Sequence, residues 1–131
     1  TQRIVTLQIA TGQRISDTMN YIASTFTENE GEITARIRQQ KTNREISVPI
    51  VGERAVEVVK TGLFRAISHQ KYNEYIKELS KRSGIDKITK SKMVVDKRLK
   101  EVETEKYNLI TSHTFRRTAL SLCFLAGIPG V

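Results

Sequence analysis

The sequence is poor in the residue types that bind metals or form disulfides. It has one cysteine, two histidines and no tryptophan. A single cysteine cannot form an intramolecular disulfide, and no acidic residue joins His69 or His113 at a metal-ligand spacing. We therefore expect no metal site and no cofactor. Cys123 stands in the apolar run "LSLCFLAG", so we expect a small core residue in a reducing compartment.

A long apolar run and a phosphate-binding glycine loop are also missing. No segment approaches the roughly 20 apolar residues that span a bilayer, and the chain opens without a basic and then apolar leader. We expect a soluble, cytoplasmic protein with no membrane partner. "ATGQRISD" contains one glycine where a nucleotide-binding loop has two and then a lysine, so nucleotide hydrolysis is not expected.

Acidic residues are outnumbered by basic ones. The chain carries 22 Lys+Arg against 14 Asp+Glu, a formal net charge of +8. This excess favours a polyanionic partner, nucleic acid first and a membrane surface as the competing polyanion. A length of 131 residues suits one domain. The chain starts at Thr1 without methionine and stops just after Gly127 and Pro129, which indicate a helix end, so we expect an excised fragment.

The first half of the chain predicts two helices and then a basic hairpin. One helix ends before Gly12, and a second runs from a cap at Ser16 or Asp17 to about Phe26, where "ENEG" breaks it. Two segments on either side of "KTNR" alternate apolar and polar residues, which predicts paired strands with Lys41 at the tip. The inward-facing residues would be Ile33, Ala35, Ile37, Ile46, Val48 and Ile50.

The second half predicts three helices and a second hairpin. "GERAVEVVKTG" forms a short helix, and an amphipathic helix runs from a cap at Ser68 to Gly84. The highly charged stretch from residue 88 to 107 is expected to be a hairpin. The last helix begins at Thr111 or Ser112. Its buried face is expected to comprise Phe115, Ala119, Leu122 and Ala126.

The residues left for chemistry are cations. Arg14 follows a glycine at a helix corner, Lys41 lies at a hairpin tip, and His113 and Arg116 share one face of a helix's first turn. Arginine binds phosphate oxygens bidentately, and lysine or histidine can transfer protons. Together these residues would support phosphoryl transfer without a metal. Each alone could also be an ordinary surface residue, and Arg117, about 100° further round the helix, would contact phosphate or solvent.

Four stretches in order carry a family resemblance: "TGQRISD", "RQQKTNREISVPI", "SHQKYNEYIKEL" and "ITSHTFRRTALSLCFLAGIP". Together they resemble the catalytic domain of tyrosine recombinases, the phage integrase family, and in particular integrases of mobile elements in Bacteroides-type bacteria. The resemblance implies an α+β fold, a mostly helical catalytic core with a small antiparallel sheet or hairpin over residues 1–131. It also implies site-specific recombination of double-stranded DNA in the bacterial cytoplasm, by a parent protein that is tetrameric on paired sites.

The resemblance also assigns roles. Arg14 and Arg116 match the two phosphate-binding arginines, Asp17 a supporting acidic residue, Lys41 the general acid toward the leaving 5′ hydroxyl, and His113 a histidine that handles protons. A tyrosine would attack the DNA phosphodiester and form a 3′-phosphotyrosyl intermediate without ATP or metal. The expected DNA-binding residues are Arg38, Lys71, Lys77 and Arg117.

One part of the family pattern is missing. The nucleophilic tyrosine and a third histidine or tryptophan follow the H-x-x-R helix, whereas all four tyrosines of this chain precede it. We therefore expect a fragment, monomeric by itself, that lacks both the amino-terminal DNA-clamping domain and the nucleophile segment and binds phosphate without cleaving DNA. Two alternatives stay open: a type IB topoisomerase-like domain with the same chemistry, and a non-catalytic basic DNA- or RNA-binding domain. Binding alone would not require Arg14, Lys41, His113 and Arg116 to converge on one cleft.

Overall fold

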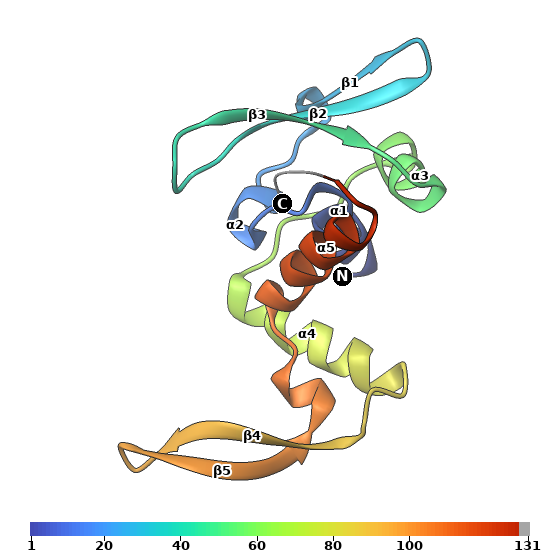
Figure 1. The fold of residues 1–131 in the computed structure, drawn as a ribbon. Coiled ribbons are helices and arrows are strands. Elements are labelled where there is room, and N and C mark those ends of the chain that lie inside the picture. The colour runs from blue at the N-terminus through green and yellow to red at the C-terminus, as the bar shows by residue number, and fades with distance from the viewer. Residues whose placement is uncertain (129–131) are drawn as a thin grey trace.

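The computed structural model describes residues 1–128 and consists of a central group of helices with hairpins on opposite sides (Figure 1). The α+β prediction is confirmed, but the prediction of a mostly helical core is wrong, because helical content is 45%. The helices are α1 (Gln2–Thr11), α2 (Ile15–Thr18), α3 (Glu53–Thr61), α4 (His69–Arg82) and α5 (Ser112–Leu125), with 3-10 turns η1 (Ala23–Thr25) and η2 (Lys106–Leu109). The strands are β1 (Phe26–Asn29), β2 (Glu32–Arg38), β3 (Glu45–Ile50), β4 (Ile88–Val95) and β5 (Arg98–Glu105).

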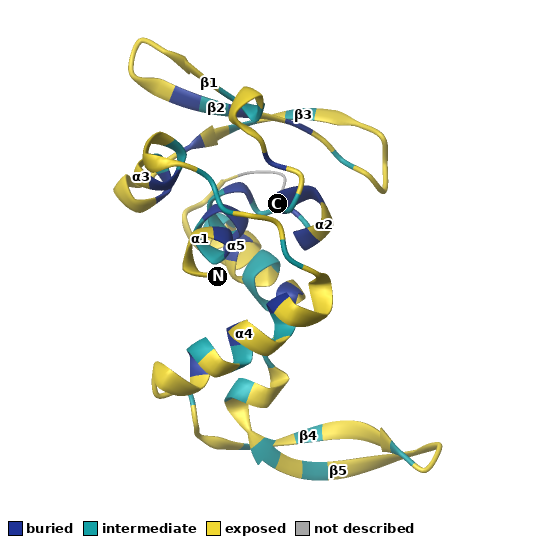
Figure 2. Ribbon diagram, turned by 180° about the vertical axis from the view of Figure 1, so that it is seen from behind, coloured by how far each residue is buried: buried dark blue, intermediate teal, exposed yellow. Residues whose placement is uncertain are grey.

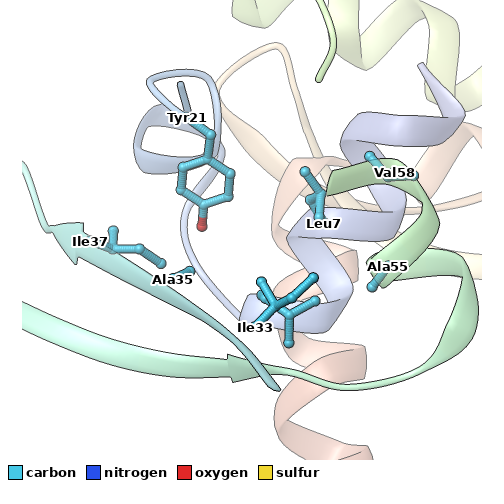
Figure 3. Close-up of a cluster of buried hydrophobic side chains, with 8 residues drawn as sticks. Leu7, Tyr21, Ile33, Ala35, Ile37, Ala55 and Val58 are labelled. Atoms are coloured by element: carbon cyan, nitrogen blue, oxygen red, sulfur yellow. The ribbon is translucent and has the colours of Figure 1, made fainter. Parts of the chain in front are cut away.

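The first sheet has the order β1-β2-β3 and is antiparallel throughout. Its central strand alternates as predicted, because successive side chains of a strand point to opposite faces. Ile33, Ala35 and Ile37 are buried in one hydrophobic cluster. In Figure 3, Ile33 lies near Leu7 of α1 and Ala55 of α3, and Ile37 lies on the side of Tyr21. The remaining buried members of this cluster are Leu7, Tyr21, Ile50, Ala55 and Val58.

A second core cluster joins α1 to α2 and α4. It consists of Ile4, Ile15, Tyr72 and Ile76, with Phe115 of α5 packed against it. The α4 helix was predicted correctly, including its cap, because Ser68 Oγ accepts a hydrogen bond of 3.2 Å from the Lys71 N–H. Helix α1 therefore contributes to both clusters and lies between the sheet and α4.

The second predicted helix is wrong. The α2 helix ends at Thr18, its cap is Arg14 instead of Ser16 or Asp17, and the segment expected to be helical up to Phe26 continues through η1 into β1. A tertiary contact explains the early end, since buried Tyr21 donates a 2.9 Å hydrogen bond to Thr11 Oγ1. "ENEG" is a hairpin turn that pairs β1 with β2, with Gly31 at φ +84°.

The last helix is buried over only its first half. Ala119 is buried and Phe115 is half-buried, but Leu122 and Ala126 are exposed, so the predicted burial of these two residues is wrong. Cys123 is half-buried instead of a core residue. Packing against α1 covers the first half of α5, while little of the described chain covers the second. The expected helix end at Gly127 has the left-handed φ of +72°, whereas Pro129 lies outside the described residues.

The second hairpin is confirmed as β4 and β5, which pair from Ile88↔Glu105 to Val95↔Arg98. In the described part of the chain, no helix combines the length and apolar character needed to cross a membrane.

Candidate functional site

The site begins at the corner between α1 and α2. Gly12 ends α1 with φ +63°, a conformation that glycine adopts without steric cost, and its N–H donates a 2.9 Å bond to the Gln8 carbonyl. The turn leaves Arg14 in extended backbone as the residue preceding α2. A Cβ atom at Gly12 would lie 3.6 Å from the Cβ of Ala119, so this corner also packs closely against α5.

A pocket of about 260 Å³ opens beside this corner. Residues from four segments line it, and three of them are the predicted site residues Arg14, His113 and Arg116. The other lining residues are Gln8, Ile15, Ser16, Met19, His69 and Ser112. The structure thus brings together residues that lie at opposite ends of the chain.

A direct hydrogen bond ties the corner to the last helix. Arg116 Nη1 donates to the carbonyl oxygen of Gly12 at 2.6 Å, in a half-buried position. Because Gly12 is two residues before Arg14, this bond sets one arginine relative to the other.

A buried polar network holds the start of α5. Gln8, 1% exposed, accepts a 2.8 Å bond from the Tyr72 hydroxyl and donates a 3.0 Å bond to the Ser112 carbonyl. The Ser112 N–H donates to Asn73 Oδ1 at 3.0 Å, and Ser112 Oγ lies 2.8 Å from Nε2 of His69. Burial raises the pKa of Tyr72 above its ordinary value, so the phenol stays protonated as a donor. These bonds position the turn from which His113 and Arg116 project.

The electrostatics of the pocket favour an anion. Its lining contains two arginines and two histidines and no carboxylate. Both α4 and α5, each 14 residues long, begin at the pocket with His69 and Ser112, and a helix amino terminus carries partial positive charge. Among the described residues no group of His, Cys, Asp or Glu could hold a metal ion. Two guanidinium groups beside two helix amino termini form an arrangement suited to an anion.

Lys41 lies outside the pocket lining. It is exposed in the turn between β2 and β3, next to a set of contacts that fasten this turn to the corner. Asp17, 2% exposed, accepts a 2.9 Å bond from the Gln40 N–H through Oδ1, and Gln39 Nε2 donates to Gln13 Oε1 at 2.7 Å. Asp17 thus anchors the residue preceding Lys41, while its Oδ2 has no partner in residues 1–128.

In a comparison with known protein families, the phage integrase family model matches residues 1–129. The chain belongs to the phage integrase family. Members of this family are tyrosine recombinases, and membership implies site-specific DNA recombination and DNA binding. No curated protein sequence and no solved structure gave a significant match.

The tyrosines of this integrase-family chain are all outside the pocket lining. The Tyr72 hydroxyl donates its hydrogen bond to Gln8. Burial raises the pKa of Tyr21 to about 12. Tyr75 lies on α4 beside the ammonium group of Lys71, 5.8 Å from the ring centroid. Tyr107 is in η2 at the base of the second hairpin.

The four predicted DNA-binding residues are distributed over three elements. Arg38 is exposed at the end of β2 and donates a 2.8 Å bond to Asn43 Oδ1 in the hairpin turn. On α4, Lys71 is exposed and Lys77 is half-buried, and Arg117 is exposed on α5. None of them lines the pocket.

The sequence did not identify four other polar residues of the pocket. Nothing in the sequence singled out Gln8, Ser16 and Ser112 were predicted only as possible helix caps, and His69 was considered only as a metal ligand. The signal for His69 was its place directly after the Ser68 cap, which puts it at a helix amino terminus. No local pattern indicated the contact with Ser112, which is 43 residues away.

Proposed function

We propose that this chain holds the scissile phosphate of a DNA duplex in the pocket lined by Arg14, His113 and Arg116. The observation that carries the proposal is that two arginines line one pocket whose lining contains no carboxylate. The hydrogen bond from Arg116 to the Gly12 carbonyl ties the second arginine to the turn that carries the first. The reaction would be metal-free transesterification in site-specific recombination. The motif resemblance supports a Bacteroides-type mobile element, a cytoplasmic bacterial location and a parent that is tetrameric on paired sites.

The two arginines would act on the phosphate itself. Their guanidinium groups bind the non-bridging oxygens and stabilise the additional charge of the pentavalent transition state. His113, on the same face of α5 as Arg116, would accept the proton of the attacking tyrosine. The tyrosine oxygen then bonds to phosphorus as the bond to the 5′ oxygen breaks, giving a 3′-phosphotyrosyl link.

Lys41 would donate the proton that the leaving 5′ oxygen takes up. Its position outside the pocket lining means that the β2–β3 turn has to approach the bound DNA. The anchor between Asp17 and Gln40 would guide this approach, because it holds the turn at the corner that carries Arg14.

The nucleophile in this proposal is not one of the four tyrosines in the chain. Tyr21 and Tyr72 are buried and hydrogen-bonded, and neither Tyr75 nor Tyr107 lines the pocket. We therefore propose that residues 1–131 form a catalytic-domain fragment that binds DNA without cleaving it and is monomeric by itself. A covalent complex with a nicked duplex, trapped on a denaturing gel, would refute this part.

The alternatives are less well supported. A purely DNA- or RNA-binding domain does not need residues from α2 and α5 to meet around a carboxylate-free lining. A type IB topoisomerase-like domain would use the same residues, but the family match is to phage integrases over residues 1–129.

Side-chain NMR of the arginines tests the pocket directly. On titration with inorganic phosphate, we expect the Nε–H resonances of Arg14 and Arg116 to shift together with one affinity. Arg117, one position further along α5 and exposed, is the matched control and should shift little. Equal shifts for Arg116 and Arg117 would contradict the assignment of the site.

DNA binding tests the partner. Fluorescence anisotropy with a duplex of about 30 base pairs, or about three helical turns, should show binding whose log affinity falls with log salt by roughly 0.9 per neutralised phosphate. Salt-independent binding would contradict the proposal. In a longer form that carries the nucleophile, Arg14→Ala or Arg116→Ala should slow cleavage by ~10²–10³-fold each, whereas Arg117→Ala should mainly weaken binding.

A further inference from the structure

The two faces of the β4–β5 hairpin carry different charges. Directly paired residues of an antiparallel ribbon share a face, and successive residues alternate between faces. The two-residue turn at Asp96 and Lys97, with φ of +52° and +61°, sets this register. One face, here the mixed-charge face, carries Ile88, Lys90, Lys92, Val94, Leu99, Glu101, Glu103 and Glu105. The opposite face, here the acid-free face, carries Thr89, Ser91, Met93, Val95, Arg98, Lys100, Val102 and Thr104.

The two faces differ in what they offer an anion. On the mixed-charge face, Lys90 is paired with Glu103 and Lys92 with Glu101, so each lysine has an opposite charge directly across the ribbon. On the acid-free face, Arg98 and Lys100 have only Val95 and Met93 across from them. Within residues 1–128, the one acidic contact of these two cations runs from Lys100 Nζ to turn residue Asp96; it is 4.0 Å long and exposed, and such pairs contribute little to stability.

We propose that the acid-free face of the β4–β5 hairpin is a second DNA-binding surface, which contacts the duplex away from the phosphate held in the pocket. The inference rests on the proposed function, because it presupposes that the pocket holds DNA. Charge complementarity selects the partner. Arg98 and Lys100 are exposed and give this face two positive charges without a carboxylate, whereas the other face has two lysines against three carboxylates. Thr89 and Thr104 are half-buried beside them, and the Ser91 hydroxyl is buried. Arginine, lysine and hydroxyl side chains are common ligands of DNA phosphates.

The placement of the hairpin supports this role. In Figure 1 the β2–β3 turn and the β4–β5 turn extend toward the left. Helix α2 and the first turns of α4 and α5 lie on the same side, and Figure 2 shows this arrangement from behind. The pocket is lined by residues of α2 and of the first turns of α4 and α5, and these elements lie between the two hairpins in Figure 1. In the proposed arrangement, a duplex bound across the pocket would have one of these hairpins on either side of it. A two-stranded ribbon has dimensions that the major groove of B-DNA admits.

The base of the hairpin is fixed to the helices. The Lys106 N–H donates a 2.9 Å bond to the Lys87 carbonyl, which closes the ribbon, and the Lys81 ammonium group on α4 lies 5.6 Å from the Tyr107 ring centroid. Since α4 also carries His69 at its other end, the hairpin and the pocket share one rigid helix. A fixed arm loses less conformational entropy on binding than a free loop does.

The experiment compares two double variants of the hairpin. Arg98→Gln with Lys100→Gln removes two cations from the acid-free face, and Lys90→Gln with Lys92→Gln removes two from the mixed-charge face. Net charge changes equally, so long-range electrostatics affects both alike. Binding of the duplex described above is measured by anisotropy at several salt concentrations, and circular dichroism confirms that both variants are folded.

We expect the acid-free pair to lower affinity by roughly tenfold at 0.1 M salt and to reduce the salt slope by up to about 1.8, since each lost phosphate contact removes about 0.9. The mixed-charge pair should change the slope by less than half as much. Equal effects of the two pairs, or no effect of either, would overturn the inference.

Two further outcomes are separable. If the unaltered chain does not bind duplex DNA, the proposed function fails together with this inference. If Arg14→Ala and Arg116→Ala weaken binding but the acid-free pair does not, only the inference fails. Val94 and Leu99 at the tip are 70% and 67% exposed, so a second copy of the chain is the competing occupant. Sedimentation tests this alternative. The hairpin would be assigned to a protein contact if the chain self-associates, if Val94→Ser with Leu99→Ser abolishes that self-association, and if the Arg98/Lys100 variant keeps full DNA affinity.

Discussion

The buried amide of Gln8 should be a large single contributor to stability near the site. Gln8→Leu removes the acceptor of the Tyr72 hydroxyl and the donor to the Ser112 carbonyl, and both groups are buried. Each unsatisfied buried group costs about 1–3 kcal/mol, and leucine burial offsets part of that loss. We expect a net destabilisation of about 3 kcal/mol, a large fraction of the total stability of a small domain.

Urea denaturation measures this effect, and a double-mutant cycle tests its cause. Gln70→Leu is the matched control, because Gln70 is an exposed glutamine on α4 and its replacement should change stability by less than about 0.5 kcal/mol. Tyr72→Phe alone should cost about 1–2 kcal/mol. Combined with Gln8→Leu it should cost less than the sum, since no hydroxyl then remains without an acceptor. Strict additivity, or a neutral Gln8→Leu, would refute the reasoning.

Two shorter predictions concern the corner and Tyr21. Gly12→Ala should destabilise the chain by about 1–2 kcal/mol, because φ is +63° there, while Ser16→Ala on the exposed side of α2 should not; thermal unfolding checks both. The pKa of Tyr21 is raised to about 12 in the folded chain, so the folded state retains the proton longer than the unfolded state and stability is lost as pH rises from about 10 toward 12. Tyr21→Phe should be slightly less stable at neutral pH and lose less over that window, and parallel losses in urea titrations at each pH would contradict the assignment.

The sequence predicted the elements that are specified by neighbouring residues, such as an alternating strand or a capped helix. The alternation of Ile33, Ala35 and Ile37 was sufficient for β2, and the serine cap at Ser68 was sufficient for the start of α4. The segment after Asp17 was misread, because the hydrogen bond from Tyr21 to Thr11 is a tertiary contact that no helix pattern shows. The same limitation applies to the second half of α5, whose apolar residues have helical spacing but little of residues 1–128 against them.

The candidate site also contains residues that the sequence indicated and residues that only the structure showed. Arg14, His113 and Arg116 could be singled out because each stands in a recognisable short motif, and their order in the chain carried the family resemblance. Gln8 and Ser112, which are 104 residues apart, gave no sequence signal, because a buried amide is identified only by the groups it bonds. Supporting residues are therefore the part of the site that requires coordinates.

The position of the site also explains why the exposed end of α5 does not disturb it. Ser112, the residue before His113, is fixed by Gln8 and Asn73, and Arg116 donates to the Gly12 carbonyl; both sets of contacts lie in the first half of the helix. Ala119, which packs on Gly12, is the last fully buried residue of α5. The polar network and this one contact set the helix before its exposed half begins. The geometry of the pocket is thus set where the first half of α5 meets α1, α4 and the Gly12 corner, and the half that carries Leu122 and Phe124 does not line it.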